Sequence, residues 1–449
     1  MKNTGPVSTQ TLVSFDGFDT AKVCIQEPDR YRYWDEQKAE QLQISRGAGL
    51  SYVGASFCAK SKSVSLRHFN RILDFCTHTN SVDVETGISL QELNAFLRSK
   101  NRYLPIQPGY GRITVGGCIA ANTHGKNPCI DGTFIDIVSS LTLFHPAYGM
   151  IEASRDENED IFDLTCGGYG TTGHIIRARL KVRDIQTQTV IVKSHYFSAP
   201  QKLIEAQKEI TPRSLFCYSW HSMLHSGKNF GQGIVFEGQF SEGSPVQNEP
   251  KGTLAAATLA SHTRGMLPIS LMNQMSLRCI NAYFSYKSRR LQKGKESSLQ
   301  EALFPIHGQE LYFKLFGKKG FHEYQAIIPF QNTEEYFDVV KFLSKKFKII
   351  LTLGSGKIFS GQTQNLRYNG KGVSLALNLP RNPSSLQFMS ALDAKIIAMS
   401  GVPNIIKDSR LPASTVEACY PDYHKVRQRL ISFDPKRLFR SILTQRLEL

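Results

Sequence analysis

The sequence predicts a two-domain protein of the α+β class. Its 449 residues are enough for two domains, each with a core of its own. Three glycine-rich segments, each followed by a strand pattern, lie between residues 46 and 182. From about Val190 the glycine clusters thin out and longer strand and helix patterns take their place, which indicates a second domain.

Composition narrows the class of protein without choosing a function. Hydrophobic residues make up 41% and charged residues 20%, as in globular proteins. No apolar run is long enough to span a membrane, and the N-terminus lacks the apolar stretch of a secretion signal. The nine cysteines have no zinc-type spacing, so we expect reduced thiols, a cytoplasmic protein and no metal site. The net charge of +16 favours an anionic partner: nucleic acid, a phosphorylated ligand or an anionic membrane surface.

The first glycine segment is RGAGLSY, residues 46–52, which follows a strand predicted at 41–45. Its glycines fall where the strand ends, so the exposed main-chain N–H groups are suited to a pyrophosphate. The segment is not a Rossmann fingerprint, because GxGxxG fails at Tyr52 and no helix pattern follows.

The second segment, residues 104–134, is the richest in glycine. It contains a short helix predicted over 115–122 and then a polar turn, residues 123–127. Glycine-rich turns beside a helix start bind anions. The third segment, residues 165–174, leads into a strand predicted over 175–182.

Periodicity predicts the remaining elements. Helices are predicted over 89–100, with a Ser89/Glu92 capping box, over 333–346 and 385–399, and in a tail with a Ser414/Glu417 capping box. Exposed loops are predicted at 241–252 and at the basic stretch 287–295. Strands are predicted at 64–69, 81–85, 137–144, 150–153, 216–223, 233–240, 311–314, 324–329, 349–353 and 373–379.

Taken together, the three segments resemble the FAD-binding domain of the vanillyl-alcohol oxidase/p-cresol methylhydroxylase (PCMH) superfamily. Within it, the chain resembles the decaprenylphosphoryl-β-D-ribose 2-oxidase family. The motifs that carry this second resemblance are THGKN at 123–127, GF..YQ..IP at 320–329, KDSR at 407–410, YP at 420–421, DP.RLF at 434–439 and RLEL at 446–449.

The resemblance implies a PCMH-type FAD-binding domain at 1–185 and a substrate-binding domain at 186–401, with an antiparallel sheet flanked by helices. Residues 402–449 are implied to return to the first domain. It implies FAD-dependent oxidation of the 2-hydroxyl of a polyprenyl-phosphate-linked ribose to a keto sugar, by hydride transfer to flavin N5. A bacterial role in cell-wall or glycan biosynthesis, an NAD(P)H-dependent epimerase or reductase partner and peripheral contact with the inner membrane are implied as well.

Three departures from the family pattern are visible. Leu50 stands where many superfamily members carry the histidine that binds the flavin covalently, so non-covalent FAD is expected. Ala376 stands in place of the reactive cysteine of the ribose oxidases, and Asn404 in place of a tyrosine. The sugar or the lipid of the substrate is therefore open to change.

The resemblance also implies site residues. Lys407 is expected to contact the substrate hydroxyl and the flavin at the end of a strand-like 404–406, with His124 orienting substrate or exchanging a proton and Lys126 steadying its phosphate. The expected substrate-binding residues are Tyr52, Tyr324, Gln325 and Lys357. The pyrophosphate is expected on N–H groups of residues 46–51 and 116–121. The expected FAD-binding residues are Arg46, Gly47, Ala48, Gly49, Leu50, Ser51, Tyr52, Pro108, Gly109, Thr114, Gly116, Gly117, Cys118, Ala121, Asn122, His124, Gly125, Asn127, Gly168, Gly170, Gly173 and Ile175.

Two alternatives stay open at this point. A soluble-sugar or aldonolactone oxidase of the same superfamily fits the glycine segments, but such enzymes usually carry the covalent histidine that Leu50 replaces. A nucleic-acid-binding protein fits the net charge alone, since no aromatic RNA-binding motif, zinc pattern or basic helix is evident, and nucleic acid is not expected as a partner.

Overall fold

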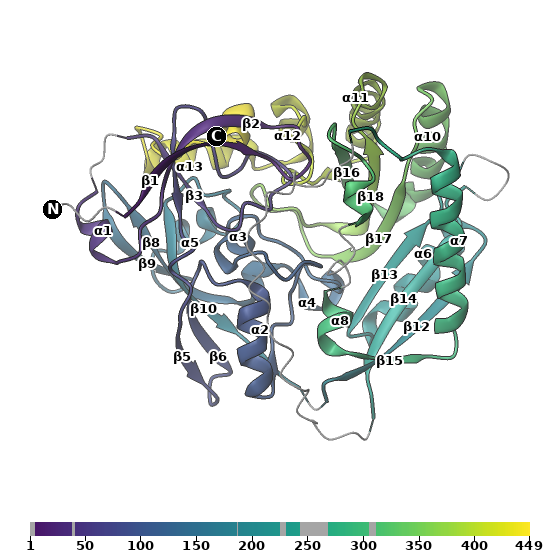
Figure 1. Cartoon of the computed structure of the whole chain (residues 1–449), viewed down its shortest axis with the longest axis horizontal. Helices are drawn as coiled ribbons and strands as arrows, with labels where there is room; N and C mark the ends of the chain where they lie inside the picture. The colour runs from purple at the N-terminus through teal and green to yellow at the C-terminus, as the bar shows by residue number, and fades with distance from the viewer. Residues whose placement is uncertain (1–4, 38–40, 186, 225–229, 243–267, 305–310) are drawn as a thin grey trace.

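The computed structural model describes the chain except for residues 1–4, 38–40, 186, 225–229, 243–267 and 305–310. Two lobes stand side by side, and the last helices of the chain return to the N-terminal lobe (Figure 1). No described helix is long and apolar enough to cross a membrane.

The first lobe contains two sheets. In one, β1 (Val7–Val13) and β2 (Thr20–Gln26) form an antiparallel pair, and β4 (Lys62–Ser65) and β3 (Gln43–Arg46) continue it in parallel, in the order β1-β2-β4-β3. The other is antiparallel, with β5 (Ile72–Cys76), β6 (Ser81–Glu85), β10 (His174–Lys181), β8 (Val138–His145) and β9 (Gly149–Ser154) side by side in that order. A short pair, β7 (Arg102–Tyr103) and β11 (Arg183–Asp184), lies apart.

The helices of the first lobe are short. The longest, α2 (Leu90–Ser99), starts at the predicted Ser89/Glu92 capping box and buries Leu90, Leu93 and Leu97 in the core. The helix predicted in the second glycine segment is α3 (Val115–Ala120), which buries Val115, Cys118 and Ile119. The others are α1 (Arg32–Asp35), α4 (Pro128–Asp131), the 3-10 turn η1 (Phe134–Ile137) and α5 (Glu159–Thr165).

The second lobe is built on one antiparallel sheet of eight strands. Its order is β15 (Lys295–Ser298), β12 (Thr189–Phe197), β14 (Gly233–Phe240), β13 (Phe216–His221), β17 (Leu353–Ser360), β18 (Lys371–Pro380), β16 (Phe321–Ile328) and β19 (Val402–Pro403). This sheet lies beside the first lobe (Figure 1).

The two faces of this sheet differ. One is covered by α6 (Pro200–Ile210), α10 (Thr333–Lys346) and α11 (Pro383–Ala398), whose apolar side chains pack on Val235, Ala326 and Leu375. The other carries α7 (Gln274–Leu291) at its edge, where Phe284 stacks on Trp220 with ring centroids 5.0 Å apart. Because side chains alternate along strands, Glu323 and Gln325 lie on this second face. The shorter elements are η2 (Thr211–Arg213), α8 (Leu299–Leu303), α9 (Leu311–Lys314) and η3 (Phe330–Asn332).

The tail packs on the first lobe. Helices α12 (Ala413–Cys419), α13 (Tyr423–Phe433) and α14 (Ile442–Arg446) bury Val416, Tyr420 and Leu443 in a cluster that includes Val53 and Tyr169. Main-chain hydrogen bonds reinforce the contact, because the Ile442 N–H donates to the Phe57 carbonyl at 2.9 Å and the Gln43 N–H to the Leu438 carbonyl at 2.8 Å.

Several predicted elements are wrong. Residues 311–314 form the helix α9 rather than a strand, 349–352 precede β17, and β4 ends at Ser65. The predicted Ser414/Glu417 capping box is absent because Pro412 occupies the N-cap of α12. Residues 404–406 form a turn after β19. The basic stretch 287–295 begins inside α7 and ends in β15, so a basic helix is present after all. Of the loop predicted at 241–252, only 241 and 242 lie within the described residues.

Candidate functional site

A cavity of about 1570 Å³ lies between the lobes. Its floor is formed by the three glycine segments, and its roof by the open face of the eight-stranded sheet. Single small-molecule sites usually occupy about 300–1,000 Å³. The cavity is therefore large enough for a dinucleotide together with a second ligand.

The first glycine segment offers an anion site. Within the described part of the chain, the main-chain N–H groups of residues 47–51 have no hydrogen-bond partner. The Arg46 guanidinium donates to Ser56 Oγ at 2.9 Å and forms no ion pair with a described carboxylate. Burial lowers the pKa of Arg46 to about 10, still well above neutral. Free N–H groups beside an unpaired cation are suited to a pyrophosphate.

The second segment contributes space instead of hydrogen bonds. The Gly116 N–H donates to the Thr86 carbonyl at 2.8 Å, and the Gly117 N–H to Thr114 Oγ1 at 3.2 Å. The prediction that these N–H groups hold the pyrophosphate is therefore wrong. A Cβ on Gly117 would meet no protein atom closer than 3.2 Å, and both glycines line the cavity. Because these glycines have no side chains, this segment leaves room for a planar ring system to lie against its backbone.

In the third segment, Tyr169, Gly170 and Gly173 line the cavity. Gly173 has φ +144°, and a Cβ there would lie 2.7 Å from the Phe144 carbonyl oxygen, so only glycine fits. Gly168 does not line the cavity. A Cβ on it would collide with the Leu164 carbonyl, so its role is to close the turn after α5.

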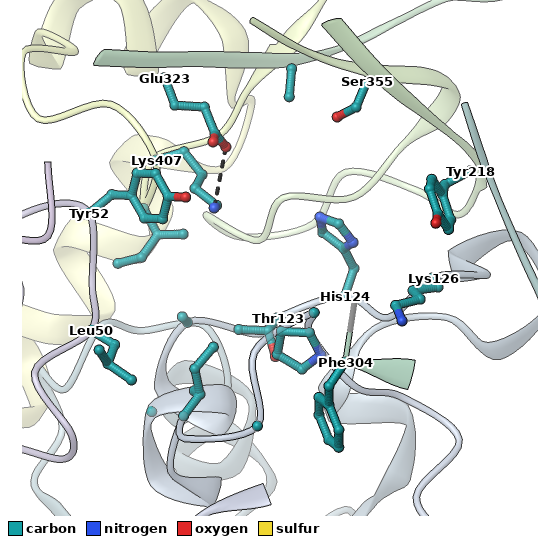
Figure 2. A pocket seen from close by; sticks show the side chains of 18 of the residues that line it. Leu50, Tyr52, Thr123, His124, Lys126, Tyr218, Phe304, Glu323, Ser355 and Lys407 are labelled. Atoms are coloured by element: carbon teal, nitrogen blue, oxygen red, sulfur yellow. Dashed lines mark ion pairs between the residues drawn. The ribbon is translucent and has the colours of Figure 1, made fainter. Parts of the chain in front are cut away.

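Lys407 lies in the cavity against Tyr52, the last residue of the first segment. Its Nζ is 3.2 Å from Glu323 Oε1 and 3.6 Å from the centroid of the Tyr52 ring. Figure 2 shows the three side chains together on one side of the cavity, above Leu50. Burial, followed by the charge of Glu323, raises the pKa of Tyr52 well above its ordinary value, so the phenol stays protonated. The ion pair and the ring contact both require the ammonium form of Lys407.

The rest of the KDSR motif holds Lys407 in place. Ser409 Oγ donates to Asp16 and to the Tyr52 carbonyl. Arg410 forms ion pairs with Asp393 and Asp408. The motif therefore links the tail, the N-terminal hairpin and the second lobe at the point where Lys407 enters the cavity.

A second polar group lies across the cavity. His124 Nδ1 is 2.9 Å from the Gly125 carbonyl oxygen and 3.5 Å from Lys357 Nζ. We assign the proton to Nδ1 because a carbonyl oxygen can only accept, and this assignment leaves Nε2 to accept a proton. Burial, followed by the charge of Lys357, lowers the pKa of His124 well below 6.5. Lys357 Nζ donates to the same carbonyl at 3.1 Å. Lys126 donates to the Ala302 carbonyl, and burial lowers its pKa well below the ordinary lysine value.

The two groups make the cavity polar along its length. Glu323 lies beside Lys407, whereas no described carboxylate forms an ion pair with Lys357 or Lys126 (Figure 2).

Most of the predicted site residues line the cavity, and some do not. Tyr324 points to the opposite face of β16, where its hydroxyl donates to Asp393 Oδ1 at 3.0 Å, so its predicted contact with substrate is wrong. Asn127 donates to the carbonyls of Thr211 and Ser214 and joins the two lobes. Cys118 lies on the buried side of α3. The residues predicted for the site but absent from the cavity lining are Arg46, Cys118, Gly125, Asn127, Gly168 and Tyr324.

The sequence prediction missed several lining residues. Glu323 precedes the predicted Tyr324 by one position, and strand alternation alone says that one of the two faces the cavity. Only the placement of Lys407 opposite β16 shows that it is Glu323. Other polar and aromatic lining residues that were missed include Thr123, Tyr218, Trp220, Tyr283, Phe284, Lys287, Lys295, Glu296, Glu301, Tyr312, Ser355 and Asn378.

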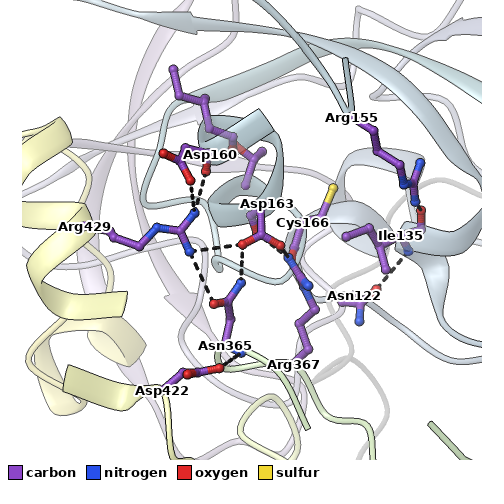
Figure 3. A network of polar contacts seen from close by, with 12 residues as sticks. Asn122, Ile135, Arg155, Asp160, Asp163, Cys166, Asn365, Arg367, Asp422 and Arg429 are labelled. Carbon is purple, nitrogen blue, oxygen red and sulfur yellow. Dashed lines mark hydrogen bonds and ion pairs between the residues drawn. The ribbon is translucent and has the colours of Figure 1, made fainter. Parts of the chain in front are cut away.

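A network of arginines and aspartates fixes the third glycine segment (Figure 3). The buried Arg367 donates to the Cys166 carbonyl at 2.7 Å and forms an ion pair with Asp163. Arg429, from α13, is 3.0 Å from the same aspartate. Burial alone would raise the pKa of Asp163, but the hydrogen bonds from Arg367, Asn365 and Arg429 outweigh it and hold the pKa below its ordinary value.

Arg367→Ala is expected to lower the free energy of unfolding by about 3–5 kcal/mol, because it removes the buried partner of Asp163 and leaves the Cys166 carbonyl without a donor. Arg429→Ala is the matched control, with an expected loss of about 1 kcal/mol or less, since its other partner, Asp160, is largely exposed. Urea titration followed by tryptophan fluorescence measures both. Equal losses in the two variants would contradict this ranking.

Comparisons with known proteins agree with this geometry. Residues 34–153 match the family model of an FAD binding domain. Decaprenylphosphoryl-beta-D-ribose oxidase of Mycolicibacterium smegmatis is 25% identical over 418 residues, which cover 90% of this chain and 89% of the relative. L-galactono-1,4-lactone dehydrogenase 2 of Oryza sativa is 28% identical over 177 residues, 39% of this chain and 29% of the relative. D-lactate dehydrogenase [cytochrome] of Arabidopsis thaliana is 30% identical over 126 residues, 26% of this chain and 22% of the relative.

The chain is an FAD-dependent oxidoreductase, and its FAD-binding domain resembles that of the vanillyl-alcohol oxidase/p-cresol methylhydroxylase superfamily. It is similar over nearly its whole length to decaprenylphosphoryl-β-D-ribose oxidase, as its motifs predicted. The residues present fit FAD: the first glycine segment has unpaired N–H groups beside Arg46, and the second leaves open floor at Gly117.

Proposed function

We propose that the chain oxidises a secondary hydroxyl, the 2-hydroxyl, of a pentose linked through phosphate to a polyprenyl chain, and that it binds FAD without a covalent bond. The single observation that carries this proposal is the composition of the cavity lining: Lys407 and Glu323 beside Tyr52, Lys357 beside His124, and the aromatic side chains of Tyr218, Trp220, Tyr283 and Phe284, which we call the aromatic arm. The similarity to decaprenylphosphoryl-β-D-ribose oxidase over 90% of the chain supports it.

Each part of the cavity has a role in the proposal. FAD, when bound, supplies the hydride acceptor. Lys407, held by Glu323 over Tyr52, donates a hydrogen bond to the substrate oxygen. His124 Nε2 is available to take the hydroxyl proton. The Lys357 ammonium faces the phosphate, and the aromatic side chains of β13, Tyr218 and Trp220, lie along the arm suited to the lipid.

The proposal of non-covalent flavin rests on the side chain at position 50. Leu50 lines the cavity at the place of the covalent histidine and has no atom able to form such a bond. We assign residues 1–185 and 402–449 to the FAD-binding unit and 186–401 to the substrate domain. The proposal includes an NAD(P)H-dependent reductase or epimerase that consumes the keto sugar, and peripheral contact with an anionic membrane.

The similarity to plant L-galactono-1,4-lactone dehydrogenases favours a second candidate, the oxidation of a soluble sugar or aldonolactone. That similarity covers only 39% of this chain. A soluble sugar or aldonolactone has no lipid chain, so its oxidation would leave the aromatic arm without a role.

Anaerobic bleaching of the flavin separates the two candidates. The FAD-loaded protein is mixed with a polyprenyl-phosphate pentose, the same pentose phosphate without lipid, the free pentose and an aldonolactone, and absorbance near 450 nm is followed. The proposal expects the fastest bleaching with the lipid phosphate and the slowest with the free pentose. Bleaching by the lactone alone would establish the second candidate.

The pH dependence of this reaction is expected to follow Lys357. Burial, followed by the charge of Lys407, lowers the pKa of Lys357 to about 8, while Glu323 acts in the opposite direction. Below this value Lys357 is an ammonium that binds phosphate, and above it a neutral amine. We therefore expect kcat/KM for the phosphate-linked substrate to fall above about pH 8.

Lys357→Arg keeps the positive charge at high pH and is expected to move the fall to higher pH, whereas Lys357→Met is expected to have low kcat/KM at every pH. A wild-type profile that rises through pH 8 would contradict the assigned role, because it would require the neutral amine.

A further inference from the structure

Helix α7 combines features that the proposed reaction does not use. It runs along one edge of the second lobe (Figure 1). Its inner side packs Leu277, Phe284 and Leu291 against the lobe, at helical spacing. Its outer side exposes Met275 (75%), Tyr283 (58%) and Tyr286 (53%). Apolar and aromatic side chains gathered on one exposed face mark an interaction surface.

The charge of α7 has one sign. From Gln274 to Leu291 the helix contains Arg278, Lys287, Arg289 and Arg290 and no aspartate or glutamate. None of these four cations forms an ion pair with a described carboxylate. Arg290 instead lies 4.7 Å from the centroid of the exposed Tyr286 ring. Cations beside tyrosines that stand in water fit the headgroup layer of an anionic bilayer, where each finds a partner.

The segment before α7 extends the same surface. Ile269 (67%) and Leu271 (40%) are exposed. The Leu271 N–H donates to the Leu315 carbonyl at 2.8 Å, which brings these residues beside the exposed Lys314. Apolar residues are thus flanked by cations on both sides. Glu296, in β15, is an exposed carboxylate near the other end of α7.

The cavity reaches this surface. Tyr283 and Lys287 of α7 and Lys295 of β15 line the cavity, and Tyr283 is more than half exposed. The aromatic arm of the cavity therefore opens beside the outer side of α7. The lipid chain of the proposed substrate resides in a bilayer. Such a substrate can enter the arm without leaving the membrane only if the bilayer lies against this opening.

We propose that α7 and residues 269–271 form a docking surface for an anionic lipid bilayer, with the mouth of the cavity facing the membrane. This inference deepens the proposed function, since it says how a lipid-linked substrate enters the cavity. It differs from the expectation drawn from net charge alone because it assigns the contact to one helix. The bilayer is recognised through its negative headgroups and its apolar interior.

Vesicle flotation of the FAD-loaded full chain tests the proposal. Wild-type protein is expected to float with vesicles of phosphatidylcholine plus phosphatidylglycerol, much less with phosphatidylcholine alone, and less in high salt. Arg289→Glu/Arg290→Glu is expected to weaken binding by about thirty-fold or more, since each basic residue near an anionic surface contributes about 1 kcal/mol. Met275→Ser/Tyr286→Ser is expected to weaken binding to the same vesicles.

Helix α10 supplies the matched control. It exposes Phe342 (64%) and carries Lys345 and Lys346, but also Glu334, Glu335 and Asp338. Phe342→Ser and Lys345→Glu/Lys346→Glu are expected to leave flotation unchanged. None of the substituted residues lines the cavity, so FAD content and melting temperature are expected to stay at wild-type values in every variant.

Several outcomes would overturn the proposal: equal flotation with both vesicle types, no flotation, or equal losses from the α7 and α10 variants. Light scattering tests another occupant of this surface, a second copy of the chain. If the wild-type protein is a dimer that Met275→Ser/Tyr286→Ser converts to a monomer, and flotation is unchanged, then α7 is a dimer interface. Flotation requires no turnover. A failure of the proposed reaction in the bleaching assay is therefore distinguishable from a failure of this surface.

Discussion

Lys407→Ala is expected to slow flavin reduction by the sugar substrate by about a hundred- to a thousand-fold, the usual effect of removing one hydrogen-bond donor to a reacting oxygen. The expectation rests on position: the Lys407 ammonium is held 3.2 Å from Glu323 and over the Tyr52 ring, at the edge of the first glycine segment. Anaerobic stopped-flow absorbance measures the rate of flavin reduction, and FAD content shows whether the cofactor is retained.

The same substitution leaves Glu323 buried without its cation, which is costly for stability. The double variant Lys407→Ala/Glu323→Gln removes the unpaired charge. It is expected to recover the lost melting temperature while flavin reduction stays slow. This pattern separates loss of the donor from loss of the fold. Near wild-type reduction by Lys407→Ala would contradict the assigned role.

Gly117→Val is expected to weaken FAD binding by about ten- to a hundred-fold, because filling a well-packed site costs about 1–3 kcal/mol. A Cβ at Gly117 meets only Thr114 Oγ1 at 3.2 Å and Ile113 Cγ2 at 3.9 Å. The two methyl groups of valine therefore extend over the floor that we assign to the flavin. Fluorescence titration of the apoprotein with FAD measures the change.

Gly117→Ala is the graded control and is expected to lie between wild type and valine. Gly173→Ala is a control of another kind, since its Cβ would meet the Phe144 carbonyl rather than the cavity, and it is expected to lower stability first. Stoichiometric, tightly bound FAD in Gly117→Val would mean that the flavin lies elsewhere in the cavity.

Many elements of the first lobe could be predicted from the sequence, because glycine clusters and strand alternation are local signals. The helix α2 was predicted with its capping box since Ser89 and Glu92 alone specify it. Strand β6 was predicted with the bounds that the structure has. Helix α9 was predicted as a strand because four residues give no usable period.

The site was harder to predict because it depends on long-range contacts. Nothing local places Lys407 against Tyr52, since the two residues are brought together by the return of the tail and by Ser409, which bonds the Tyr52 carbonyl. The family resemblance assigned both residues to one site, and their direct contact was not predicted. In β16, Glu323 faces the cavity and Tyr324 faces away from it. Which of the two faces the cavity depends on the register of β16 within the eight-stranded sheet.

A crystal structure of the FAD complex would locate the flavin relative to Lys407. We expect the pyrophosphate against the N–H groups of residues 47–51, and the isoalloxazine ring over Gly117 with Lys407 facing it. A flavin ring bound away from Lys407, at the far end of the cavity beside α7, would show that Lys407 does not act at the flavin.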